Sequence, residues 1–183
     1  NGLTYGFLSA ITTESDSSTW HSYFDPDSIY LPYKYPKKYF VSRIKQDYFA
    51  GNSFLGLMTT SSIDDSAHIV SLDGMVNLLD NQISIDGQAV LSSDKKRGVL
   101  GNITYSPSGY FSTWIDYQKY ETGLDFNHLG YIWRDNYSQI KTGIKFQDQE
   151  QRGFIRSSAI ILEGDIEENS DGLNLGKTLE LSY

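Results

Sequence analysis

The stretch that decides the fold is AHIVSLDGMVNLLDNQISIDGQAVLS, residues 67–92. In both of its halves, large apolar residues alternate with small or polar ones, as in Val70, Ser71 and Leu72. A period of two predicts β-strands, because successive side chains of a strand point to opposite faces of the sheet. Asp80 to Gln82, between the halves, have the composition of a tight turn. We therefore expect strands over 67–79 and 83–92, joined as a hairpin.

The same period recurs in nearly every window of the chain, in place of the 3.6-residue period of a helix. It predicts further strands near residues 3–10, 39–48, 53–60, 99–105, 111–118, 139–147, 153–163 and 173–183. The chain is therefore expected to be all-β, an antiparallel up-and-down β-barrel of about ten strands over residues 1–183.

The connections between these strands are expected to alternate in length. Tight turns are predicted at residues 50–53, 80–82, 106–109 and 147–151, and longer connections at residues 14–38, 61–66, 93–97, 119–136 and 164–172. In an up-and-down sheet such an alternation places all the short turns at one end of the strands. This asymmetry is typical of bacterial outer-membrane barrels.

Composition excludes several classes of protein. The 183 residues include no cysteine, so disulfides, thiolate metal sites and catalytic thiols are excluded. Fifteen Lys and Arg stand against 23 Asp and Glu, with a net charge of −8, so we expect no nucleic-acid partner. A run of roughly 18 apolar residues, which a spanning helix needs, is absent from the sequence. The mean hydropathy of −0.41 is compatible with a barrel that has an apolar outside and a polar inside.

Alternation does not decide which face of the barrel meets water. A soluble barrel turns its apolar face inward, and a membrane barrel turns it outward. Mid-strand glycines such as Gly74, Gly87 and Gly101 favour a strongly curved sheet, and tyrosines near strand ends favour an interfacial girdle. These features favour the membrane barrel. A soluble β-barrel or sandwich that binds a small ligand is the first alternative.

Motifs for catalysis are not found in the sequence. His21, His68 and His128 lack metal-ligand spacing, and no nucleophile elbow or phosphate-binding loop is present. We therefore expect no metal, no cofactor and no catalytic residue. A carbohydrate-active hydrolase stays open as the second alternative, because such an enzyme needs only two suitably spaced carboxylates.

Two groups of residues are candidate functional sites. An aromatic segment could stack on the rings of an oligosaccharide or fold over the barrel mouth; its residues are Trp20, Tyr23, Tyr30, Tyr33 and Tyr35. The second group would line the lumen of a membrane barrel, either pairing across strands or setting the selectivity of a pore. Its members are Arg43, Lys45, Asp47, Asp73, Asp86, Asp116, Lys141, Lys145 and Glu180. The acidic segment at residues 163–171 is expected to be a solvated loop.

Five stretches taken in order resemble a large bacterial family, the C-terminal domain of unknown function 5916. They are GLTYGFLSAIT at residues 2–12, YFVSRIKQDY at 39–48, FLGLMTT at 54–60, IVSLDGMVNL at 69–78 and GLDFNHLGYIWRDN at 123–136. The family's D-F-x-x-x-L-G-aromatic motif is matched by Asp125, Phe126, Leu129, Gly130 and Tyr131, and its charged strand by Arg43, Lys45 and Asp47.

The resemblance implies a Gram-negative outer-membrane β-barrel embedded in lipid, with a transport or surface-binding role and no known catalytic residue. In the family this barrel follows a carbohydrate-binding family 9-like sandwich and is longer than 183 residues. The sandwich is not in this sequence, so the resemblance implies a single barrel domain or a segment of a larger barrel.

Overall fold

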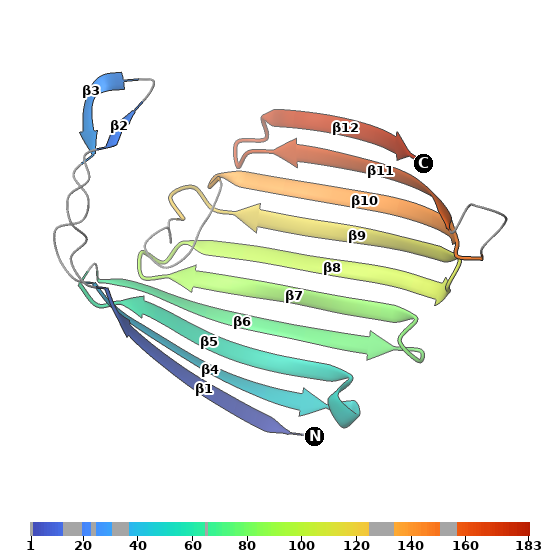
Figure 1. Cartoon of the computed structure of the whole chain (residues 1–183), viewed down its shortest axis with the longest axis horizontal. Helices are drawn as coiled ribbons and strands as arrows, with labels where there is room; N and C mark the ends of the chain where they lie inside the picture. Colours follow the sequence, from blue (N-terminus) through green and yellow to red (C-terminus); the bar gives the residue numbers. More distant parts are fainter. Residues whose placement is uncertain are drawn as a thin grey trace.

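The structure is a computed structural model that describes residues 2–12, 20–22, 25–30, 37–64, 66–124, 134–150 and 157–183. Ten strands form one antiparallel sheet in which every strand pairs with its neighbours in sequence order (Figure 1). These strands are β1 (Leu3–Ile11), β4 (Lys38–Tyr48), β5 (Ser53–Ser62), β6 (Ala67–Leu78), β7 (Ile83–Ser92), β8 (Arg97–Ser108), β9 (Phe111–Tyr120), β10 (Tyr137–Asp148), β11 (Ser158–Glu168) and β12 (Asn174–Ser182).

The predicted all-β, up-and-down fold of about ten strands is confirmed. Strands β6 and β7 form the expected hairpin, with Val76 opposite Ile85. Strands β1 and β12 are the two edges of the sheet, and the strand pairs of the described residues include none between them. What the structure describes is therefore an open, curved sheet, whose edge strands lie at opposite sides of Figure 1.

The predicted alternation of short and long connections is wrong. The connections expected to be long at residues 61–66, 93–97 and 164–172 span only four or five residues between strands, whereas the connection expected to be tight at 147–151 spans residues 149–157. Strand β11 runs from Ser158 to Glu168 and was expected at 153–163. Because it ends at Glu168, most of the acidic segment at 163–171, which was expected to be a loop, is strand. Two short strands, β2 (Trp20–Ser22) and β3 (Asp25–Tyr30), pair within the connection expected at 14–38.

Two ends of the sheet can be distinguished by their connections. The loop rim carries the connections β1 to β4, β5 to β6, β7 to β8, β9 to β10 and β11 to β12, and the turn rim carries the other four. One of these four includes the 3₁₀ turn η1 (Phe49–Gly51). The two longest connections, which follow β1 and β9, both lie at the loop rim, whereas the connection at residues 149–157 lies at the turn rim.

The two faces of the sheet differ in both chemistry and exposure. On β6, the apolar side chains of Val70 and Leu72 are 43% and 49% exposed, whereas Ser71 between them is 2% exposed. The register propagates this division across the sheet, because Leu72 lies opposite Leu57 on β5 and Ala89 on β7. We call these the apolar face and the polar face.

The sheet curves around its polar face. Small residues are buried there on five strands, which is expected where side chains crowd together on the inside of a curve. They are Gly56, Ser62, Ser71, Ser92, Gly98 and Gly143. The apolar face lies on the outside of the curve, and no second layer covers it in the part of the chain that the structure describes.

Candidate functional site

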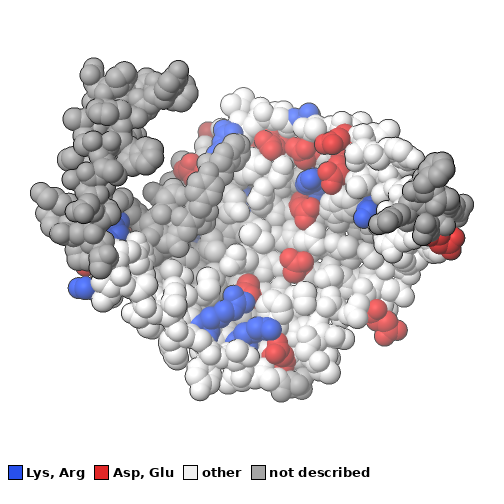
Figure 2. Space-filling view, viewed as in Figure 1, with Lys and Arg blue, Asp and Glu red and all other residues white. Residues whose placement is uncertain are grey.

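The polar face gathers the ionisable side chains that the sequence singled out. Register places all nine of the predicted lumen residues on this face: Arg43, Lys45, Asp47, Asp73, Asp86, Asp116, Lys141, Lys145 and Glu180. Glu163, Asp165 and Glu167 of β11 join them, because β11 extends further than expected. Figure 2 shows charged side chains across the middle of the sheet. Acidic residues outnumber basic ones, and the basic ones lie on β4 and β10.

An ion pair on this face passes over a strand. Arg43 on β4 donates through Nη2 to the Oδ2 atom of Asp73 on β6, although β5 lies between them. Gly56 on β5 makes room, because a Cβ there would lie 2.8 Å from Oδ1 of Asp73 and 3.0 Å from Nη2 of Arg43. Oδ1 of Asp73 is buried without a hydrogen-bond partner among the described residues. Because Gly56 has no side chain, Arg43 and Asp73 can form an ion pair although their strands are not adjacent.

The second cation of β4 is held by its own strand and the next one. Nζ of Lys45 lies 2.9 Å from Oδ1 of Asp47 and 4.7 Å from the centre of the Phe54 ring. These contacts combine an ion pair with a cation–π interaction. Lys45 and Arg43 are the two basic residues that β4 places on the polar face, as Lys141 and Lys145 are on β10.

Amide side chains connect β9, β10 and β11. Nε2 of Gln118 donates to Oε1 of Gln139 at 2.7 Å, and Nε2 of Gln139 donates to Oε1 of Glu167 at 3.0 Å. The hydroxyl of Tyr137 donates to the same Glu167 oxygen at 2.9 Å. This chain of hydrogen bonds runs across the sheet near the loop rim, and no sequence motif marked it in advance.

Further acidic residues vary in their pairing. Nδ2 of Asn102 donates to Oδ1 of Asp116 at 2.5 Å, and Nζ of Lys141 lies 3.1 Å from Oε2 of Glu163. Asp86 and Asp165 form no ion pair within the described ranges. Of the two alternatives for these residues, cross-strand pairing is present for some of them, and the role of the others in the selectivity of a pore stays a prediction.

An apolar cluster lies on the polar side at the loop rim. Leu124, just beyond β9, is 1% exposed, and a Cβ at Gly98 would lie 3.0 Å from its Cδ2 atom. The same Cβ would lie 2.8 Å from Tyr120 and 2.9 Å from Val90. The start of the connection after β9 therefore packs inward, over the space that Gly98 leaves.

The other predicted site residues lie outside what the structure describes. This applies to the side chains of Trp20, Tyr23, Tyr30, Tyr33 and Tyr35, and to the family-motif residues Asp125, Phe126, Leu129, Gly130 and Tyr131. Their roles stay predictions.

Within the described ranges, His, Asp and Glu side chains do not form a group of three that could hold a metal ion. Those ranges also include no helix that is long and apolar enough to cross a membrane. Comparisons with family models, curated proteins and solved structures found no match to this chain. The resemblance to the family named above therefore stays a prediction, and the site must be interpreted from its own chemistry.

Proposed function

We propose that this chain forms part of the wall of a β-barrel in the outer membrane of a Gram-negative bacterium. Its polar face would line a water-filled interior that is used for transport or surface binding. The observation that carries the proposal is the exposure of the apolar face on the main sheet. Leu57, Leu72, Ile103 and Ile144, from β5, β6, β8 and β10, are each 40% exposed or more. Exposing such a surface to water is unfavourable, and lipid is the solvent that suits it.

The ends of the apolar face support this orientation in a membrane. Aromatic residues that are exposed at or near the turn rim form a belt: Tyr5, Tyr48, Phe49, Tyr105, Tyr110, Phe146 and Tyr183. Rings of this kind suit the boundary between hydrocarbon and water. The lysines and the arginine on the apolar face lie near the loop rim in the described part of the chain: Lys38, Arg97, Lys119 and Lys177. Basic residues suit the anionic headgroup region of a membrane.

The edges of the sheet support a closed wall. Leu3 and Phe7 on β1 are 64% and 71% exposed, and Leu179 on β12 is 78% exposed. Neither edge strand contains proline, which is one protection of an exposed edge. Because unpaired backbone groups are very unfavourable in lipid, we propose that both edges are paired in the membrane, as parts of a larger barrel.

The excess of acidic groups on the polar face supports a preference for cationic or neutral polar solutes. Rings of carboxylates are the usual means by which protein pores favour cations. Five acidic residues of this face form no ion pair within the described residues: Asp86, Asp116, Asp165, Glu167 and Glu180. We propose transport of polar solutes as the class of function, without catalysis by this chain.

Single-cysteine labelling tests the orientation directly, because the chain has no cysteine of its own. A bimane label is attached at Leu72→Cys, Ile103→Cys or Ile144→Cys on the apolar face, and at Gln88→Cys or Thr104→Cys on the polar face. In vesicles, brominated lipid chains should quench the first set, and aqueous iodide should quench the second. Iodide quenching of both sets with no bromine effect would overturn the proposal in favour of a soluble protein.

A further inference from the structure

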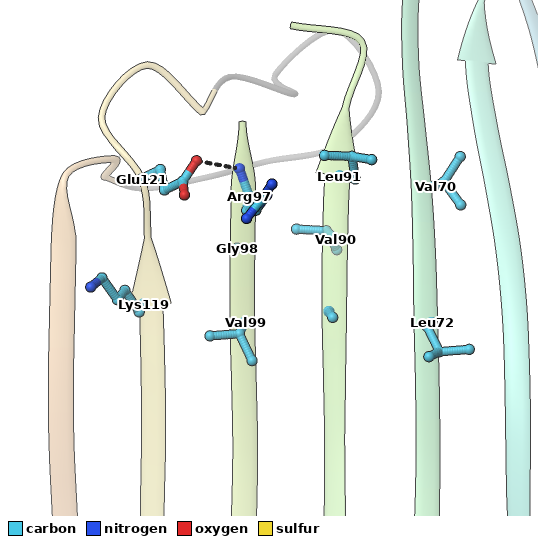
Figure 3. Close-up of a pocket in the computed structure, with 10 residues that line it drawn as sticks. Val70, Leu72, Val90, Leu91, Arg97, Gly98, Val99, Lys119 and Glu121 are labelled. Atoms are coloured by element: carbon cyan, nitrogen blue, oxygen red, sulfur yellow. Dashed lines mark hydrogen bonds between the residues drawn. The ribbon is translucent and has the colours of Figure 1, made fainter. Parts of the chain in front are cut away.

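The apolar face contains a groove that begins at the loop rim. It has a volume of about 510 Å³ and is lined by the ends of β6, β7, β8 and β9 (Figure 3). Leu72 and Val99 flank Ala89, which lies opposite both of them in register. The small side chain of Ala89 leaves a depression between two larger ones, and this depression gives the groove its depth.

The groove continues along the sheet over a row of glycines. Gly74, Gly87 and Gly101 lie opposite one another on β6, β7 and β8. A second hollow of about 420 Å³ includes Gly74 and Gly87 and shares Leu72, Ala89 and Val99 with the first. The two hollows therefore form one apolar channel that runs down the outside of the sheet from its loop rim.

Positive charge lies at the rim end of this channel. Arg97, the first residue of β8, and Lys119, near the end of β9, both line the groove and are exposed. Neither forms an ion pair within the described part of the chain. Glu121 is the acidic residue of the lining, and its Oε2 atom accepts the backbone N–H of Arg97 at 2.9 Å (Figure 3). The two cations are therefore available to an anion, with one carboxylate engaged beside them.

We infer that this groove binds one anionic phospholipid, with its phosphate between Arg97 and Lys119 and an acyl chain along Ala89 toward the glycine row. Charge complementarity selects this occupant, since an apolar channel that ends in two unpaired cations matches an acyl chain that ends in a phosphate. The inference rests on the proposed function, because it requires that the apolar face lies in lipid.

The test uses bimane at Ile103→Cys, beside the groove, and at Ile144→Cys, on the apolar face of β10. Each protein is reconstituted in phosphatidylcholine vesicles with a small fraction of phosphatidylglycerol, and either lipid carries the brominated chains. Brominated phosphatidylglycerol should quench the label at residue 103 more strongly than the label at 144. Beside residue 103, phosphatidylglycerol should be enriched over phosphatidylcholine by about fivefold for each basic residue that binds its phosphate.

Matched variants assign that enrichment to the groove. The pair Arg97→Gln and Lys119→Gln should remove it, whereas Lys177→Gln, another apolar-face lysine near the loop rim, should leave it unchanged. Ala89→Trp should fill the depression and lower quenching at residue 103. Ile140→Trp, at an exposed position on the apolar face of β10, should have no such effect.

The other outcomes are distinguishable. Equal quenching of both labels by brominated phosphatidylglycerol would overturn the groove but leave the membrane proposal intact. Bromine quenching at residue 144 alone, together with dimers on crosslinking, would overturn the phospholipid site in favour of a second copy of the chain in the groove. No bromine quenching at either position would mean that the proposed function itself is wrong.

Discussion

The indole of Trp114 lies directly over Gly143, its partner in register on the neighbouring strand. A Cβ built on Gly143 would lie 2.1 Å from Cζ2 of Trp114 and 2.5 Å from Cε2, so the ring occupies the place of the missing side chain. In the sequence, Trp114 is a large aromatic residue among the polar ones that share its face. The structure explains this exception, because the ring covers the backbone that Gly143 leaves bare on the polar face.

Replacing Gly143 by Val should displace the indole and lower the free energy of unfolding by about 1–3 kcal/mol. Chemical denaturation in detergent measures the loss, and the emission of Trp114 reports the displacement when Trp20 and Trp133 are replaced by Phe. Gly6→Val is the control, because a Cβ at Gly6 meets nothing within 4 Å. Equal losses for both variants would contradict the proposed packing.

The Arg43 to Asp73 ion pair should show energetic coupling across β5. A double-mutant cycle with Arg43→Gln and Asp73→Asn should give a coupling energy of about 0.5–3 kcal/mol in the free energy of unfolding. Gly56→Ala should reduce this coupling, because the new Cβ would enter the path of the pair. A coupling energy of zero in the original background would mean that the pair contributes nothing.

A charge placed at mid-strand should have opposite consequences on the two faces. Ile103→Lys, on the apolar face, should make folding into lipid less favourable by about 2–4 kcal/mol, because the ammonium would enter hydrocarbon. Gln88→Lys, on the polar face, should change it far less. Folding titrations into vesicles measure both variants, and similar losses would count against lipid contact on the apolar face.

The acidic excess of the polar face should show in the reactivity of an engineered thiol. At Gln88→Cys, a trimethylammonium methanethiosulfonate reagent should react faster than its sulfonate counterpart, because Asp73 lies opposite and Asp86 lies on the same strand. Asp86→Asn should lower the ratio of the two rates. Asp80→Asn, in the turn after β6, is the control and should leave the ratio unchanged.

Packing at the loop rim should depend on Gly98. A valine there would meet Tyr120, Val90 and Leu124 at 2.8–3.0 Å, so Leu124 should be displaced from its buried position. Limited proteolysis after residue 120 should then become faster in Gly98→Val than in the parent chain. An unchanged cleavage rate would show that Leu124 is held by other contacts.

The sequence by itself determined the strands and the division of residues between two faces. The period of two is local information, because side chains alternate whatever a strand pairs with, and so the hairpin of β6 and β7 was predicted closely. The same period assigned Arg43, Asp73 and Asp116 to one face. The prediction was wrong at β11, because its sequence contains many acidic residues, and such a composition is also typical of a solvated loop.

Only the tertiary structure decided which residues meet across strands and which face is exposed. Register is set by all the strands together, so no local pattern could place Arg43 beside Asp73 over Gly56, or Trp114 over Gly143. The glycine row and Ala89 form a groove for the same reason, since they come from different strands. The direction of curvature likewise depends on all the strands of the sheet together, and it places the apolar side chains on the outside of the curve.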